Sequence, residues 1–363
     1  MTIISIIVTL LIFSVIVVVH EYGHFIAARK NGILVEEFAV GMGPVLFSHK
    51  KGDTLYSIRA FPIGGFCKML GEEDESNDPR AFSSKKVWQR IVVCIAGVVM
   101  NFLLAVVLGC VLISVTGVRT TVIEEVFDGT PAQAAGFMPG DKLLKINGKN
   151  IWAYEYTSFY LLANGGEKPA EVTFERNGSK MTVLLTPFAE EGEGGMPVYY
   201  MGVSMAVNAG VFSGASAEYT RAGFMETVKG AFGQSTFLIT ATVDSLSQLF
   251  QRKVDKENLM GPIGMGQMVD SELKSAAKME ESAFISFFSF AVYMAMFLSA
   301  NLAVMNLLPI PALDGGRIVF LIIEGVRRRP IDPEKEGWIH LVGFALVIGL
   351  AIFVAFNDIR RIF

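Results

Sequence analysis

The chain has 363 residues, of which 52% are hydrophobic and 18% are charged, and its mean hydropathy is +0.47. This composition is too apolar for an ordinary soluble enzyme and indicates a protein of the lipid bilayer. The formal net charge of −4, without a basic stripe among aromatic residues, gives no indication of nucleic-acid binding. The three cysteines show no CxxC spacing, so we expect packing residues rather than disulfides or metal ligands.

Four apolar segments reach the roughly 20 residues that a membrane-spanning helix needs. In chain order they cover residues 2–28, 91–115, 284–323 and 338–356. The first segment lacks the basic start and the small-residue cleavage site of a secretory signal, so we expect it to be retained.

Basic residues beside the first three segments predict the orientation, because short loops rich in Lys and Arg stay in the cytosol. These clusters are Arg29 and Lys30, then Lys85, Lys86 and Arg90, and finally Arg327, Arg328 and Arg329. The N-terminus and residues 116–283 are therefore expected on the extracytoplasmic face. Arg360 and Arg361 would lie outside as well, which is a mild exception to the rule.

The first apolar segment ends in the sequence HEYGH, residues 20–24. On a helix that starts near residue 2, His20 lies about 27 Å along the axis, close to the cytosolic edge of the hydrocarbon core. His20 and His24 project from nearly the same face, with Glu21 beside them, so two imidazoles could hold Zn²⁺ while a carboxylate transfers protons. The alternative is a set of polar residues that snorkel at a helix end, although ionisable residues within spans are usually functional.

A catalytic zinc needs a third protein ligand and an open position for water. The candidate is Asp314 in the sequence NLLPIPALDGGR, residues 306–317, where two prolines and two glycines interrupt the third apolar segment. Irregular backbone at membrane depth is tolerated only where protein or a cavity surrounds it. The predicted orientation brings Asp314 to the same leaflet as His20. The alternative is a helix-breaking loop aspartate.

HEYGH in the first segment, together with NLLPIPALDGG in the third, closely resembles the site-2 protease family of intramembrane zinc metalloproteases, in particular its bacterial RseP type. The resemblance covers nearly the whole chain. It implies Zn²⁺ as cofactor, Glu21 as the catalytic base, and as zinc ligands His20, His24 and Asp314. It also implies that the path of the substrate, a transmembrane helix of a single-pass membrane protein, is lined by Asn306, Pro309 and Pro311.

Residues 54–70 have a strand-like composition that Pro62, Gly64 and Gly65 interrupt, and they resemble the membrane-associated β-hairpin of the same family. A transmembrane substrate must unwind before its carbonyls can be attacked, and a strand edge can hold the unwound stretch. We therefore expect Gly64 and Gly65 to contact substrate. The alternative is a cytosolic hairpin without substrate contact.

The extracytoplasmic segment contains a second module. Residues 130–151 read as a short helix, a Gly-Asp turn and a strand, and they resemble a PDZ domain. The sequence YYMGV at 199–203 resembles the PDZ carboxylate-binding loop but follows the rest of the domain, which suggests a circular permutation. The expected groove for a peptide C-terminus comprises Tyr200, Met201, Gly202 and Val203. The alternative is a spacer domain without a ligand.

Three connecting segments are less informative. Residues 219–252 carry apolar side chains at helical spacing among polar ones, which predicts a helix on the outer membrane surface, packed on the PDZ region, or an ordinary core helix. MGPIGM at 260–265 is read as a turn that matches a family motif, and the acidic run at 71–79 as a solvated loop.

The predicted fold is a mainly α-helical polytopic membrane protein, with about four transmembrane helices and a membrane-associated β-hairpin, plus an inserted extracytoplasmic α/β PDZ domain. The expected parts are residues 1–117 (membrane), 118–207 (PDZ), 208–283 (surface helix and connector) and 284–363 (membrane). The predicted function is an intramembrane zinc metalloprotease of the bacterial cell membrane, which cuts substrates such as a pre-cleaved anti-sigma factor or signal-peptide remnants in regulated intramembrane proteolysis. The alternatives are a membrane-anchored quality-control zinc protease of the HtpX type, and a non-enzymatic PDZ scaffold or proton-relay protein.

Overall fold

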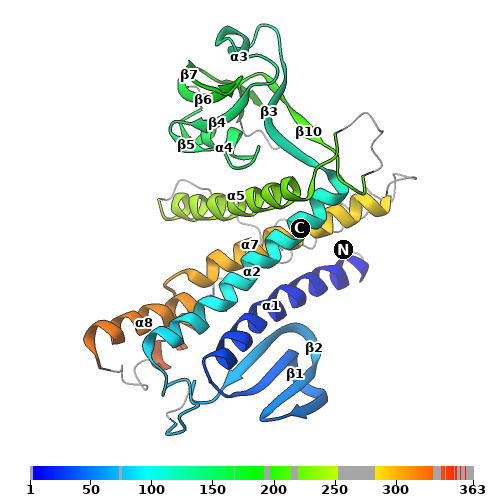
Figure 1. The fold of residues 1–363 in the computed structure, drawn as a ribbon. Coiled ribbons are helices and arrows are strands. Elements are labelled where there is room, and N and C mark those ends of the chain that lie inside the picture. Colours follow the sequence, from blue (N-terminus) through cyan, green and yellow to red (C-terminus); the bar gives the residue numbers. More distant parts are fainter. Residues whose placement is uncertain are drawn as a thin grey trace. The chain divides into compact units, whose positions relative to one another are not determined.

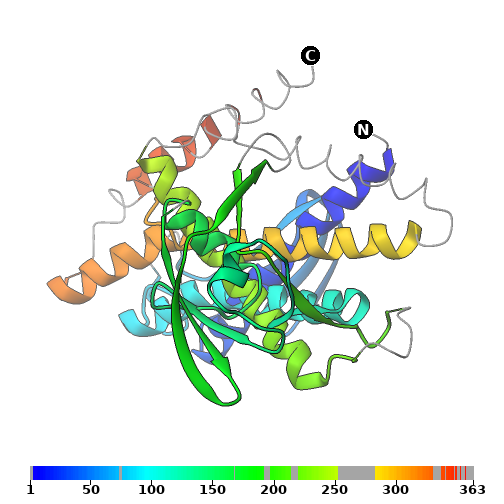
Figure 2. The same ribbon diagram turned by 90° about the horizontal axis from the view of Figure 1, so that it is seen from above.

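The structure is a computed structural model. It describes residues 3–72, 76–166, 168–191, 197–213, 220–251 and 283–329, together with parts of 337–356. The chain divides into two compact units. The first comprises Met1–Ala105 and Thr242–Phe363, and the second Val106–Ala241. Figures 1 and 2 show the elements of each unit from two directions.

Three described helices are long and apolar enough to cross a membrane. They are α1 (Ile3–Lys30), α2 (Val87–Thr116) and α7 (Ala283–Leu307). The first two predicted spans and the first part of the third are thus confirmed as helices of sufficient length, and the chain has the multi-pass character expected of a membrane protein.

The third predicted span, 284–323, is not one continuous helix. α7 ends at Leu307, and a short turn with Pro309 and Pro311 separates it from α8 (Asp314–Arg327). Proline removes a backbone donor and collides with the preceding turn of a helix, which explains the interruption. Of the fourth predicted span, described residues between 337 and 346 are helical, and most of the rest lies outside the described residues.

A hairpin of two long antiparallel strands follows α1. It consists of β1 (Val35–Lys51) and β2 (Thr54–Met69). Ala39 pairs with both Ser57 and Phe66, so the first half of β1 lies between the two halves of β2. The predicted strand at 54–70 is present, but β2 continues through its proline and glycines with shifts of register instead of ending there. The last part of β2 forms a sheet edge beside α1.

The second unit is built on an antiparallel sheet. Its strands have the order β10-β3-β4-β6-β7, and β5 pairs with β4. The chain order of the elements is β3 (Val118–Val126), α3 (Pro131–Ala134), β4 (Lys142–Ile146), β5 (Lys149–Asn150), α4 (Tyr156–Ala163), β6 (Ala170–Arg176), β7 (Ser179–Leu185), β8 (Phe188–Glu191), β9 (Pro197–Tyr200) and β10 (Val203–Asn208). The last strand, β10, lies at an edge and pairs with the first strand, β3.

A buried ion pair stabilises this sheet. The Asp141 side chain is 1% exposed, and both of its oxygens accept hydrogen bonds of 2.7 Å from the Arg176 guanidinium. A further hydrogen bond of 2.9 Å comes from the Met138 backbone N–H. Burial of Asp141 favours the neutral acid, but the Arg176 and Met138 hydrogen bonds outweigh that effect and lower the pKa of Asp141.

The predicted helix at 219–252 is present as α5 (Phe224–Phe250). Within the second unit its Phe237 ring packs against Tyr156 at 5.3 Å and Phe159 at 5.8 Å, both on α4. Gln234 also donates a hydrogen bond of 3.1 Å to Glu155. The helix thus packs on this unit, whereas its position on the outer membrane surface stays a prediction. The turn predicted at 260–265 lies outside the described residues, as do 73–75 of the acidic run.

Candidate metal centre

The two histidines of the HEYGH sequence lie one turn apart on α1 and are nearly closed to solvent. His20 is 6% exposed and His24 is 8% exposed. Their Nε2 atoms are 3.1 Å apart. His24 Nδ1 lies 2.8 Å from the Val93 carbonyl oxygen on α2, so Nδ1 carries the proton and donates it to this oxygen. The Nε2 lone pair of His24 is consequently free and points toward His20, as a metal ligand requires.

Asp314, the first residue of α8, brings a carboxylate to the same point. Its Oδ2 lies 3.1 Å from His20 Nε2 and 3.4 Å from His24 Nε2. The reversal from α7 to α8 is tight, since a Cβ atom on either Gly315 or Gly316 would collide with backbone carbonyl oxygens of the turn. The two glycines therefore allow the aspartate to enter beside α1.

These three atoms have the spacing that a zinc ion demands. Tetrahedral zinc holds ligands at about 2.0–2.1 Å, which places the ligand atoms about 3.3 Å apart. The observed separations are 3.1, 3.1 and 3.4 Å. Asp314 Oδ2 is buried, with no hydrogen-bond partner in the described part of the chain, and a cation would satisfy it. Two imidazoles and one carboxylate can thus hold zinc with a fourth position open.

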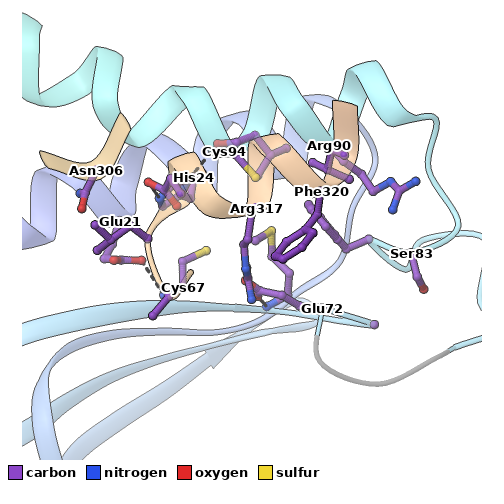
Figure 3. Close-up of a pocket in the computed structure, with 18 of the residues that line it drawn as sticks. Glu21, His24, Cys67, Glu72, Ser83, Arg90, Cys94, Asn306, Arg317 and Phe320 are labelled. Carbon is purple, nitrogen blue, oxygen red and sulfur yellow. Dashed lines mark hydrogen bonds and ion pairs between the residues drawn. The ribbon is translucent and has the colours of Figure 1, made fainter. Parts of the chain in front are cut away.

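Glu21 lies beside this triangle and is oriented by the hairpin. One of its carboxylate oxygens is within 4.8 Å of ligand nitrogens of His20 and His24. Its Oε2 accepts a hydrogen bond of 3.0 Å from the Cys67 backbone N–H at the edge of β2, which Figure 3 shows directly below the carboxylate. Sequence reasoning missed this contact, because a backbone donor leaves no signature in side-chain identity.

Of the predicted substrate residues, Asn306 is the one with a described contact to a candidate metal ligand. It stands near the end of α7 (Figure 3), and its Nδ2 is 3.2 Å from His20 Nε2. Pro309 and Pro311 lie in the turn before α8, and the described residues that line the central cavity include Ala312 and Leu313 but neither proline. Of the described strand β2, Cys67 and Met69 line that cavity, whereas Gly64 and Gly65 do not.

The predicted PDZ groove residues lie in the second unit, where β9 ends at Tyr200 and β10 begins at Val203. Met201 is buried in the core, and its carbonyl oxygen accepts a hydrogen bond from Ala132 N–H at 2.9 Å. The Gly202 carbonyl oxygen accepts one from Phe127 N–H at 3.0 Å. Tyr200 is half-exposed, and Val203 begins the edge strand β10.

The metal centre opens into a cavity of about 1010 Å³ in the first unit. Besides the candidate ligands and Glu21, four further charged residues line it, as two ion pairs between Arg317 and Glu72 and between Arg90 and Glu324. Figure 3 shows Arg317 extending from α8 toward Glu72. Glu72 belongs to the acidic run expected to be solvated, but its side chain is only 16% exposed, because Arg317 binds it. Arg317 stands one helical turn after Asp314 on α8, but no sequence pattern links it to Glu72, which is distant in the chain.

Comparisons with known proteins point to one class. The model of Peptidase family M50 matches residues 8–350. A Clostridium acetobutylicum protein named "Putative zinc metalloprotease" is 34% identical over 359 residues, which cover 99% of this chain and 98% of the relative. Proteins with the same description from Clostridium perfringens and Staphylococcus aureus are 36% identical over 356 residues and 31% identical over 444 residues. These alignments cover 98% of both chains in the first case and 99% of both in the second.

Proposed function

Since the chain belongs to peptidase family M50, the site-2 protease family, we propose that it hydrolyses peptide bonds within the transmembrane segments of single-pass membrane proteins. The protein is a zinc metalloprotease of a membrane. The observation that supports the finer proposal is the position of the candidate metal centre at the ends of apolar helices. A peptide bond that reaches this centre has to come from within or beside the bilayer.

The proposed zinc ligands are His20, His24 and Asp314. Zinc supplies Lewis acidity to the attacked carbonyl and to the attacking water. Glu21 then accepts a proton from that water and returns it to the leaving amine. Because the Cys67 N–H binds Oε2 of Glu21, we assign the exchange of protons to the other carboxylate oxygen.

The edge of β2 is the proposed docking strand for the unwound substrate. The backbone N–H groups of Cys67 and Met69 point away from β1, toward Glu21 and Glu72. An edge with outward donors can pair with an extended peptide. In this proposal Gly64 and Gly65 continue the docking edge, and the Asn306 amide binds a substrate carbonyl near the metal ligands.

The turn between α7 and α8 forms the other wall of the proposed substrate path. Pro309 and Pro311 belong to this turn and make its backbone irregular. Since the turn directly precedes Asp314, a substrate that runs along it reaches the candidate ligands. In this proposal the two prolines shape the substrate path and do not bind the metal.

We also propose that the second unit contains a circularly permuted PDZ domain at 118–207, followed by the connector 208–283, between membrane parts at 1–117 and 284–363. The pairing of β10 with β3 supports a permuted chain order, and among the described strands none pairs with the other edge of β10, which suits strand addition by a peptide C-terminus. Tyr200, Met201, Gly202 and Val203 would form the groove that begins this edge.

The proposed setting is a bacterial cell membrane, with the N-terminus and the PDZ domain outside the cytosol. The basic clusters beside the first three spans support this orientation. The PDZ domain would then admit substrates whose outer part has been removed, such as a pre-cleaved anti-sigma factor or signal-peptide remnants. A third ligand from the Asp-Gly-Gly turn rather than from a glutamate helix argues against the HtpX type, and the family membership excludes a non-enzymatic scaffold.

Co-expression with single-pass substrates, with and without their outer domains, tests two proposals together. These are the hydrolysis itself and the selection by the PDZ domain of substrates without an outer domain, which we call the gate. Wild type should cut the shortened substrates, and Glu21→Gln should retain zinc but cut none of them, because it lacks the proton acceptor. Glu36→Gln, which alters an exposed β1 ion pair with Lys68, is the matched control and should cut normally. Cleavage by Glu21→Gln at the wild-type rate would remove Glu21 from the mechanism, and cleavage of these substrates only outside their transmembrane segments would refute the intramembrane substrate.

A further inference from the structure

One face of α2 contacts both candidate histidine ligands. Val93, Gly97 and Asn101 are spaced by four residues, so they lie on the same side of this helix. The Val93 carbonyl oxygen binds His24 Nδ1 at 2.8 Å, and the Asn101 side chain lies 3.2 Å from His20 Nδ1. Between them Gly97 presents no side chain to the rings. The face therefore has a separate contact for each imidazole.

Asn101 requires an explanation, because it is a polar residue inside an apolar spanning helix. It is 0% exposed, and its Oδ1 has no hydrogen-bond partner among the described residues. An unpaired buried amide oxygen destabilises the fold by about 1–3 kcal/mol. Polar residues within membrane spans therefore usually have a function. The backbone carbonyl of Asn101 accepts a hydrogen bond of 2.8 Å from Ser299 on α7, which fixes this turn of α2 beside the metal centre.

The role of the Asn101 amide follows from the tautomer that His20 needs as a metal ligand. His20 Nε2 faces both His24 Nε2 and Asp314 Oδ2, so this is the nitrogen that would bind zinc. A neutral imidazole that offers the lone pair of Nε2 carries its proton on Nδ1, and this N–H needs an acceptor. Asn101 is the closest side chain to Nδ1 for which a hydrogen bond is described, at 3.2 Å, while the Asn306 amide is nearer to Nε2.

We propose that Asn101 is a positioning residue whose side-chain carbonyl oxygen accepts a hydrogen bond from His20 Nδ1–H and thereby directs Nε2 toward zinc. A turn of the amide by 180° exchanges the places of Oδ1 and Nδ2, so Oδ1 faces the His20 Nδ1–H and Nδ2 takes the position for which no partner is described. The Val93 carbonyl plays the same part for His24. This inference rests on the proposed role of His20 as a zinc ligand.

Zinc affinity tests the inference independently of proteolysis. Full-length protein in detergent is stripped with a chelator and titrated with Zn²⁺ against a chromophoric competitor. Loss of a group that orients a metal-binding histidine typically lowers metal affinity about 10–100-fold, which is the result expected for Asn101→Leu and Asn101→Ala. Asn101→Asp keeps an acceptor oxygen and should bind zinc at least as tightly as wild type. Thr54→Val removes a buried hydrogen bond to Val35 in the hairpin and should change zinc affinity less than twofold.

The outcomes separate this inference from the assignment of the metal ligands. His20→Ala should lose zinc binding. If it does so while both Asn101→Leu and Asn101→Ala bind zinc as wild type does, Asn101 has no positioning role. Equal losses in Asn101→Asp and Asn101→Ala would also overturn the proposal, because they would show a packing role instead. Retention of zinc by His20→Ala would refute the ligand assignment itself.

Discussion

Gly97 leads to the sharpest prediction about the metal centre. A Cβ atom on Gly97 would lie 2.6 Å from His24 Nε2, 2.7 Å from His20 Cε1 and 2.8 Å from His20 Nε2. Carbon contacts in protein cores are about 3.5–4.0 Å, so both rings would have to retreat by about 0.7–1 Å. Metal–ligand distances tolerate only about 0.2 Å. Gly97→Ala should therefore spoil the zinc geometry while it leaves the apolar helices intact.

The size of the effect follows from the cost of overpacking, about 1–3 kcal/mol for an inserted methyl group. If the zinc-bound state alone is destabilised by this amount, the zinc affinity falls about 5–150-fold. The assay is a zinc titration of the purified full-length protein, with thermal melts of the zinc-free and zinc-loaded forms. The matched control is Gly325→Ala on α8, which places a methyl group 3.5 Å from Val87 Cγ1, an ordinary contact, and should bind zinc normally. Wild-type zinc affinity in Gly97→Ala would refute the close fit between α2 and the histidines.

Three further predictions concern other parts of the molecule. Asp314→Asn should lower both zinc content, measured by elemental analysis, and proteolysis, and equal zinc content in mutant and wild type would point to a different third ligand. Deletion of residues 118–207 should relax the choice of substrate in a co-expression assay without stopping hydrolysis, and a folded but inactive deletion would contradict the gate. Because the pKa of Asp141 is lowered in the folded state, its ion pair stabilises the protein above the unfolded pKa of about 3.9 and is lost as the pH falls through the folded pKa. In scanning calorimetry, wild type should thus be more stable than Asp141→Asn, by about 2 kcal/mol, at pH 5–6, and a difference that persists undiminished at the lowest pH would contradict this reasoning.

The parts of the site that could be predicted were those with a local pattern. Spacing of four residues was enough to place His20 and His24 on one face of a helix, and the broken third span marked Asp314 as exceptional. Both are consequences of helix geometry and of the cost of polar groups in lipid. The three spanning helices could be predicted equally well, because an apolar stretch of about 20 residues rarely forms anything other than a membrane-spanning helix.

The contacts that could not be predicted depend on how the helices are rotated and packed against each other. Asn101 is a polar residue in an apolar span, but the sequence does not show which neighbour it faces. Gly97 likewise has meaning only once α2 lies against the two rings. Glu72 was read as solvated, because its partner Arg317 is distant in the chain. These errors share one cause, since tertiary contacts between distant segments decide the outcome.

The wide separation of His20 and Asp314 along the chain has a consequence for biosynthesis. Translation at about 5–20 residues per second needs about 15–60 s to pass from one to the other. During that interval the newly inserted helix α1 carries two imidazoles but lacks the carboxylate that completes the triangle. With the ligand roles proposed above, a nascent or prematurely terminated chain cannot assemble the hydrolytic centre. Such a chain therefore cannot cleave neighbouring proteins at the translocation site.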